Sequence, residues 1–448
     1  MTAAPAPAAR PLGVLTCTCL IIGNVVGAGF YLSPAALAPF GMVAVLGWFL
    51  LAIGAMCIGM VFARLASIAP AAGGPYAFAR KAFGPLTGFI VAWTYWISIW
   101  ASLPAIALTL AGYLLAFFPG APKDPWVTVA IALAAMWGIC LLSFRGTATV
   151  GSLQRWAVAL KILPFIAVGT IGLFWVRPEN LAPLNPSGMP VLSALSTLAP
   201  LVMFAFLGIE SATVPAGDVD NPKVTIPRAT LIGTAICALL YIFCTIAVMG
   251  IIPRETLAAS SSPFTDAARI MWGPWAASVM GAAVVISSFA ALNGWTLLLG
   301  QVPLAAARDG AFPRVFGHTN SRGAPALGLA ISLSLSSILL VAQGVGGHAI
   351  AAAYEILVQL STTASMIPYI FCTMAEAMLV KSLVDRGGGW RIGPYTPAAL
   401  VAFAFSVWVV FGSGATAAMW SLILMFLALP IYVVLARRQP EPALEPFT

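Results

Sequence analysis

The stretch IIGNVVGAGFYLSP, residues 21–34, is as apolar as a membrane helix, yet its backbone suits a continuous helix poorly. Gly23, Gly27 and Gly29 lie close together in it, and Pro34 ends it. A glycine in a helix interior costs roughly 1 kcal/mol relative to alanine. The stretch therefore predicts a helix that is interrupted, and the rest of the sequence has to explain why.

The composition places the chain in a membrane. Its 448 residues are 61% hydrophobic and 8% charged, which leaves too little charge for the surface of a soluble protein. About 20 apolar residues span a bilayer, and lipid requires backbone groups to be paired within the segment, so apolar runs of this length predict helices. The expected spans are residues 12–38, 42–66, 84–117, 125–144, 153–176, 192–216, 227–252, 275–305, 324–343, 351–380, 396–412 and 416–436.

The basic residues predict the orientation of these spans. With the N-terminus in the cytoplasm, sixteen of the 21 lysine and arginine residues fall on the cytoplasmic side and four on the opposite side. Such an excess is the usual mark of cytoplasmic loops, so we expect both termini in the cytoplasm. The net charge of +8 then follows from topology and does not indicate a nucleic-acid partner.

A second interruption is expected in the sixth span, at APLVMFAFLGIESATVPAG, residues 199–217, where Pro200 and Pro215 flank an irregular stretch. One such feature would be a tolerated kink. Two, five spans apart, are typical of transporters built from inverted repeats. An unwound segment exposes amides at a helix N-terminus, which attract a carboxylate, and carbonyls that accept from an ammonium. The two interruptions therefore predict a binding site for the head group of a zwitterion.

Six motifs carry a resemblance to a known family, over about residues 11–436. They are GNVVGAGFYLSP, PAAGGPYAFARKAFGP (70–85), FLGIESA (206–212), NPKVTIPRA (221–229), SPFTDAAR (262–269) and GWTLLLGQVPLAAARDGAFP (294–313). Through them the chain resembles the amino acid–polyamine–organocation superfamily, and most of all its arginine/agmatine antiporters. The resemblance implies an all-α integral membrane protein with 12 transmembrane helices. It implies a LeuT-like 5+5 inverted repeat with broken helices 1 and 6, plus two peripheral helices.

The same resemblance implies a division of the chain and a location. Residues 1–11 are rich in proline and alanine, and we expect them to be a disordered tail. The resemblance makes 12–380 the ten-helix transport core, 381–436 two peripheral helices, and 437–448 a C-terminal tail. The expected location is the bacterial inner membrane, with many passes.

The resemblance also implies roles for particular residues. The substrate carboxylate would meet the amides of Ala28 and Gly29, and Trp295 would lie against the substrate side chain. Tyr95 and Tyr369 would act as gates, and Glu210 would respond to protons. The expected substrate-binding residues are Val25, Gly27, Ala28, Gly29, Ser98, Ile99, Leu103, Phe204, Leu207, Trp295 and Ser361.

Several positions depart from the arginine antiporters. Ala28 replaces a serine, Phe204 a tryptophan, Leu103 an asparagine and Ile106 a methionine, and Ile99 stands at a small thiol position. These changes make the distal pocket less polar or alter its shape, and a buried guanidinium without partners is costly. We therefore expect arginine to bind weakly.

Lys161 is a further departure, since it lies in the middle of the fifth span. A lysine at this depth in a membrane is expected to have a function. The alternative is a side chain that extends to the membrane surface and serves no function. In other members of the superfamily, a lysine here takes the cation site that sodium-coupled relatives use, between spans one and eight.

The expected function is thus an antiporter or exchanger that moves an amino acid, its decarboxylated amine, or both, by alternating access. The alternative is a proton-coupled symporter or exchanger of neutral amino acids. An enzyme is disfavoured because the sequence lacks HExxH, GxSxG and P-loop motifs, and two histidines cannot build a metal centre. A channel would need a continuous polar pore. We expect no cofactor and no metal; the expected partners are the substrate and the lipid bilayer, and a homodimer is left open.

Overall fold

The computed structural model describes residues 13–68, 74–118, 120, 124–144, 162–210, 219–347, 350–385 and 396–437. Within these ranges the chain is helical and contains no β-strand. The helices are α1 (Val14–Val25), α2 (Ala28–Tyr31), α3 (Ser33–Leu37), η1 (Ala38–Phe40), α4 (Met42–Ile68), α5 (Pro75–Phe83), α6 (Pro85–Leu115), α7 (Pro125–Ser143), η2 (Ile171–Trp175), η3 (Pro178–Leu181), α9 (Val191–Phe204), α10 (Pro222–Ile251), α11 (Arg254–Ala258), α12 (Pro263–Trp272), α13 (Pro274–Arg308), η6 (Arg314–Gly317), α14 (Ala326–Val345), α15 (Ile350–Asp385), α16 (Thr396–Gly412), α17 (Gly414–Phe426) and α18 (Ala428–Ala436).

Every span expected from the sequence has a helical counterpart. Eight helices among the described residues are long and apolar enough to cross a membrane, with α17 and α18 taken together as one of them. Four shorter apolar helices, Val14–Gly23, Ile162–Trp175, Val191–Phe204 and Thr396–Gly412, match the first, fifth, sixth and eleventh spans. The first and sixth are short because each is interrupted.

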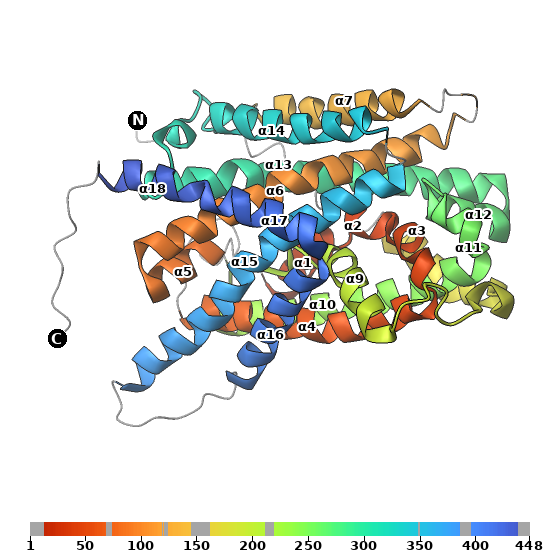
Figure 1. The fold of residues 1–448 in the computed structure, drawn as a ribbon, viewed down its shortest axis with the longest axis horizontal. Coiled ribbons are helices and arrows are strands. Elements are labelled where there is room, and N and C mark those ends of the chain that lie inside the picture. The colour runs from red at the N-terminus through yellow and green to blue at the C-terminus, as the bar shows by residue number, and fades with distance from the viewer. Residues whose placement is uncertain are drawn as a thin grey trace, which may run out of the picture.

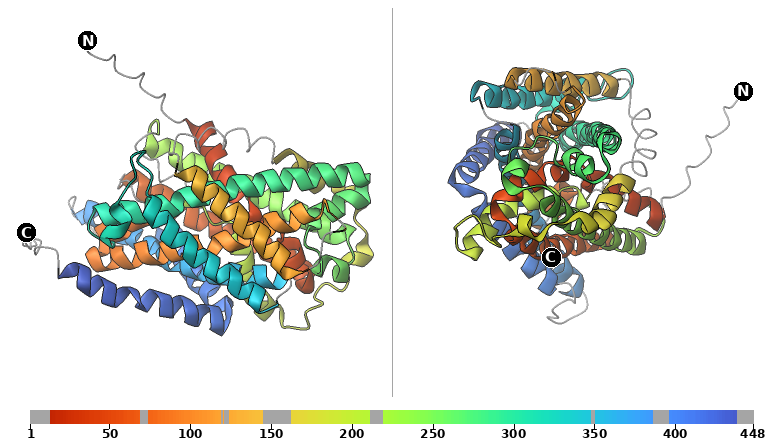
Figure 2. Two further views of the ribbon diagram at one scale, coloured as in Figure 1. Left: turned by 90° about the horizontal axis from the view of Figure 1, so that it is seen from above. Right: turned by 90° about the vertical axis from the view of Figure 1, so that its right-hand side faces the viewer.

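Most of the helices run side by side along the long axis of the molecule, as Figure 1 shows. α6 lies at the centre: 94% of the most apolar stretch of this helix is buried, and α13 and α15 pack along it. α7 and α14 pack together at one edge of the bundle (Figures 1 and 2). Only 11% of the most apolar stretch of Gly414–Ala436 is buried, so α17 and α18 are peripheral.

The two halves of the chain repeat one local design. α5 begins at Pro75, ends at Gly84 with φ +90°, and is followed at once by the long α6. α12 begins at Pro263, ends at Gly273 with φ +88°, and is followed at once by the long α13. A glycine with positive φ ends a helix, and a proline is favoured at the first position of the next one, which explains both junctions. Their recurrence supports an internal repeat.

The interruptions lie where the sequence predicts them. α1 ends at Val25, and Val26 and Gly27 are extended before α2 begins. In the sixth span Pro200 sits inside α9, and the helix gives way to turns only after Phe204. The second break therefore begins one turn later than the first flanking proline.

Candidate functional site

Tyrosine hydroxyls from neighbouring helices satisfy carbonyls that the broken backbone exposes. Tyr241 on α10 donates to the Val25 carbonyl at 2.7 Å and lies 3.2 Å from the Ala205 carbonyl, so it joins both breaks. Tyr354 on α15 donates to the Gly29 carbonyl at 2.6 Å. Because buried carbonyls without partners are costly, these two side chains stabilise the irregular segments.

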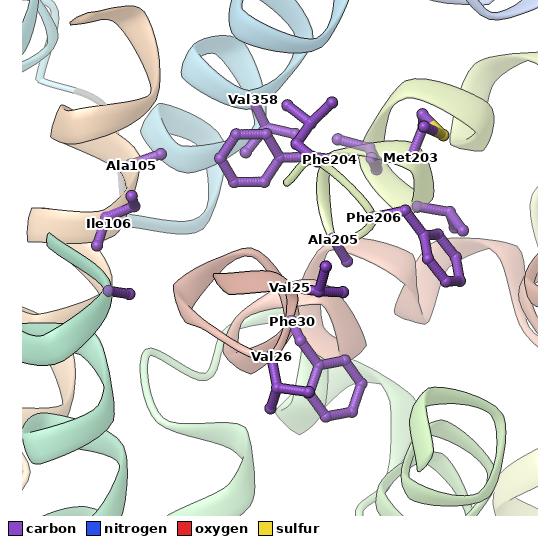
Figure 3. Close-up of a cluster of buried hydrophobic side chains, with 14 of the residues drawn as sticks. Val25, Val26, Phe30, Ala105, Ile106, Met203, Phe204, Ala205, Phe206 and Val358 are labelled. Atoms are coloured by element: carbon purple, nitrogen blue, oxygen red, sulfur yellow. The ribbon is translucent and has the colours of Figure 1, made fainter. Parts of the chain in front are cut away.

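The two interrupted helices touch at Gly29. A Cβ atom built on Gly29 would lie 2.9 Å from Cδ1 of Phe204 and 3.3 Å from Cα of Ala205. Only a residue without a side chain allows this approach. Figure 3 shows the ring of Phe204 pointing from the end of α9 towards Ile106 of α6. Val25, at the α1 break, lies on the near side of Phe30 and Val26 as seen from Phe204.

A small cavity lies between the two breaks. Its volume, counted as the space open to the centre of a water molecule, is about 20 Å³. This space holds a water molecule and is far too small for an amino acid. The described lining residues are Val25, Gly27, Gly29, Ile106, Phe204, Leu207, Ala291 and Trp295. The site is therefore closed in this structure, with both breaks and α13 in its wall.

Glu210, three residues after the wall residue Leu207, is held by two tyrosines. Its side chain is 1% exposed. Tyr95 of α6 donates to Oε1 at 2.7 Å, Tyr369 of α15 donates to Oε2 at 2.6 Å, and the Gly208 amide donates to Oε2 at 3.2 Å. A buried carboxylate needs such donors. The cluster connects the sixth span with α6 and α15.

The structure brings six of the eleven expected substrate residues into the cavity wall: Val25, Gly27, Gly29, Phe204, Leu207 and Trp295. Ser98 and Ser361 lie together instead, since the Ser361 hydroxyl donates to the Ser98 carbonyl at 2.8 Å, and neither lines the cavity. Ile99 and Leu103 are fully buried in α6 outside the wall. They could face a substrate only after the site opens.

Two expectations concern parts that the structure does not describe. Lys161 and the side chain of Ala28 both lie outside the described residues. The assignment of Lys161 to a cation site therefore stays a prediction. No group of three or more metal-ligating side chains occurs in the described part of the chain.

Sequence reasoning did not assign Ala291, Tyr241 or Tyr354 to the site. It placed Ile106 in the distal pocket, and Ile106 lines the cavity. The two tyrosines carried a usable signal, because each is a polar hydroxyl within an apolar span and needs a partner there. Ala291 carried none, since its position on the wall depends on the rotation of α13.

Comparison with known proteins places this architecture in a family. The profile of the amino acid permease family matches residues 12–436. The cadaverine/lysine antiporter of Escherichia coli K12 is 33% identical over 81% of this chain and 82% of its own length. The putrescine transporter PotE of the same strain is 28% identical over 95% of this chain and 96% of its own length. The protein of that name in Haemophilus influenzae is 28% identical over 94% and 96%.

These matches cover nearly all twelve spans and both interruptions. With the helices described above, they confirm the expected fold, an all-α membrane protein with a LeuT-like inverted repeat, broken helices 1 and 6 and two peripheral helices. The chain belongs to the amino acid permease family of the amino acid–polyamine–organocation superfamily, among its basic amino acid and polyamine antiporters.

Proposed function

We propose that the protein is a secondary transporter that exchanges an amino acid for an amine by alternating access, with both termini in the cytoplasm. One observation carries the proposal: the cavity is bounded by the two interrupted helices and by Trp295. Broken helices that meet near the middle of a bundle are where such transporters bind substrate. The relatives are named as transporters, in agreement with the expectation that the chain is not an enzyme.

The head group would bind to the backbone at the first break. The amides of Ala28 and Gly29 begin a helical segment, and such amides attract a carboxylate. The α-ammonium would donate to the Val25 carbonyl, which already accepts from Tyr241 and has a second lone pair. The Phe204 carbonyl accepts from the Leu207 amide in the same way and offers a second acceptor.

The small volume of the cavity supports a site that changes shape during transport. Since about 20 Å³ holds no amino acid, Phe204 and its neighbours must move before substrate enters. Phe204 packs on Gly29 from the opposite break, so its displacement would separate the two interrupted helices. Opening and occupancy would therefore be coupled, as alternating access requires.

Glu210 would supply the response to protons. As a carboxylate it accepts from the hydroxyls of both Tyr95 and Tyr369. A protonated carboxyl becomes a donor at one oxygen and a weaker acceptor there, so the tyrosine hydrogen bond to that oxygen would weaken or reverse. Protonation would thus loosen the sixth span from α6 or from α15. Lys161 stays the second candidate for a charge that takes part in transport.

The wall chemistry favours a substrate with an aliphatic chain. Ile106, Phe204 and Ala291 offer apolar surface, which suits the methylenes of lysine or a diamine. Glu210, which does not line the closed cavity, would be the counter-charge for a terminal ammonium once the site opens. The same apolar wall also favours the second candidate, a proton-coupled carrier or exchanger of neutral amino acids.

Competition binding to purified protein tests the proposal and separates these candidates. Lysine, cadaverine, putrescine, arginine and leucine would each compete with one labelled ligand. We expect lysine or a diamine to bind more tightly than arginine. The Trp295→Ala variant should lose binding, and Trp126→Ala, at an exposed tryptophan of α7, should keep it. Tightest binding by leucine would favour the second candidate, and equal loss in both tryptophan variants would refute the site.

A further inference from the structure

A large groove lies far from the substrate cavity, between the end of α13 and the last helix. Its volume is about 610 Å³, within the range of ligand pockets. One wall comes from the end of α13 and the segment that follows, with Arg308, Phe312 and Arg314. The other comes from α18, with Ile431 and Val434. Nothing in the transport cycle proposed above uses this groove.

The groove is basic. Arg308 and Arg314 are both exposed, and neither guanidinium has a carboxylate within salt-bridge distance among the described residues. The adjacent carboxylate, Asp309, lies 3.6 Å from Arg80 instead. Two arginines that line one groove without a described carboxylate in reach suit a phosphate, which arginine binds through paired hydrogen bonds.

The opposite wall is apolar and lies at membrane depth. No charged residue occurs between residues 414 and 436, and Arg437 is the first after the helix. Val434 is 55% exposed, one turn before that arginine. The groove therefore runs from a lipid-facing apolar surface to a pair of arginines at the level where both α13 and α18 end.

We propose that this groove binds an anionic phospholipid from the leaflet at that end of the bundle. The phosphate lies between Arg308 and Arg314, and an acyl chain lies along Ile431 and Val434. Basic pockets between helices at the membrane surface bind anionic head groups in this manner. A soluble anion would use the arginines and leave the apolar wall empty, so the shape of the groove favours the lipid.

Lipid binding to the purified, delipidated full chain tests the proposal. The probes are phosphatidylglycerol, phosphatidylcholine and inorganic phosphate, with bound lipid counted by native mass spectrometry and stability followed by thermal unfolding. The test variant is Arg308→Gln with Arg314→Gln, and Arg314→Gln alone is the milder version. Arg322→Gln is the matched control, because it removes an exposed arginine of the same connecting segment that does not line the groove.

We expect phosphatidylglycerol to bind the unaltered protein and raise its unfolding temperature, with no such effect from phosphatidylcholine. The double variant should bind phosphatidylglycerol about thirtyfold more weakly, the single variant about fivefold, and the control unchanged. Equal affinity in the double variant and the unaltered protein would overturn the proposal, and so would equal loss in the control. Full protection by inorganic phosphate would make the groove an anion site only. A change of oligomeric state in the double variant would make it a contact between copies.

Discussion

Replacing Gly29 by alanine probes the contact between the two interrupted helices. The added Cβ would lie 2.9 Å and 3.2 Å from two ring atoms of Phe204 and 3.3 Å from Cα of Ala205. Overpacking of this kind costs about 1–3 kcal/mol. The cavity seen here is closed and empty, and we expect the arrangement that closes again around a bound substrate to keep the contact between Gly29 and Phe204. The cost then falls on the substrate-bound arrangement, so affinity should fall about 5- to 150-fold. Equilibrium binding of a labelled substrate to purified protein measures it.

A matched control and a double-mutant cycle make the test specific. Gly138→Ala on α7 adds the same methyl group where nothing lies within 4 Å, and should leave affinity unchanged. In a Phe204→Ala background, Gly29→Ala should lose most of its effect, because the ring that it meets is gone. Full affinity in Gly29→Ala, or an undiminished effect without the ring, would refute the reasoning.

Three further predictions follow from the same contacts. Tyr241→Phe removes the hydroxyl that joins both breaks and should cost about 1–3 kcal/mol, seen as a lower unfolding temperature than in Tyr432→Phe at the periphery; equal temperatures would contradict the bridging role. Tyr369→Phe removes one of the two hydroxyl donors to Glu210 and should alter the pH profile of exchange, and an unchanged profile would exclude this coupling. Asp266 lies in the loop helix α12, outside the spans, and burial raises the pKa of its carboxyl. The folded state therefore favours the protonated form, so stability should fall as pH rises from about 4 through the raised pKa. Asp266→Asn should remove this fall, which is measured as the unfolding temperature against pH. An equal fall in the variant and the unaltered protein would mean that another group causes it.

The sequence sufficed for the spans and for the position of the first break. Apolar runs of about 20 residues have one stable form in lipid, so helix and span coincide. Gly27 and Gly29 locate the first break: Gly27 is extended between α1 and α2, and a Cβ atom on Gly29 would crowd Phe204 and Ala205. The second break was harder to place, since Pro200 is accommodated within α9 and the helix ends at Phe204.

The arrangement of the site depends on packing that local sequence does not encode. Glu210, Tyr95 and Tyr369 were each predicted to function, but their hydrogen-bonded cluster joins residues more than 100 positions apart. Ser98 and Ser361 were expected to bind substrate. In this closed arrangement the Ser361 hydroxyl donates to the Ser98 carbonyl and neither residue lines the cavity, so their role stays a prediction.

Counterflow in proteoliposomes tests the central claim most directly. Labelled cadaverine would be supplied outside vesicles that contain either unlabelled lysine or no substrate. If exchange takes place through this cavity, uptake should occur only into the loaded vesicles. Gly29→Ala should lose that uptake, and Gly138→Ala should retain it. Equal uptake into empty and loaded vesicles without a proton gradient would contradict exchange through this site.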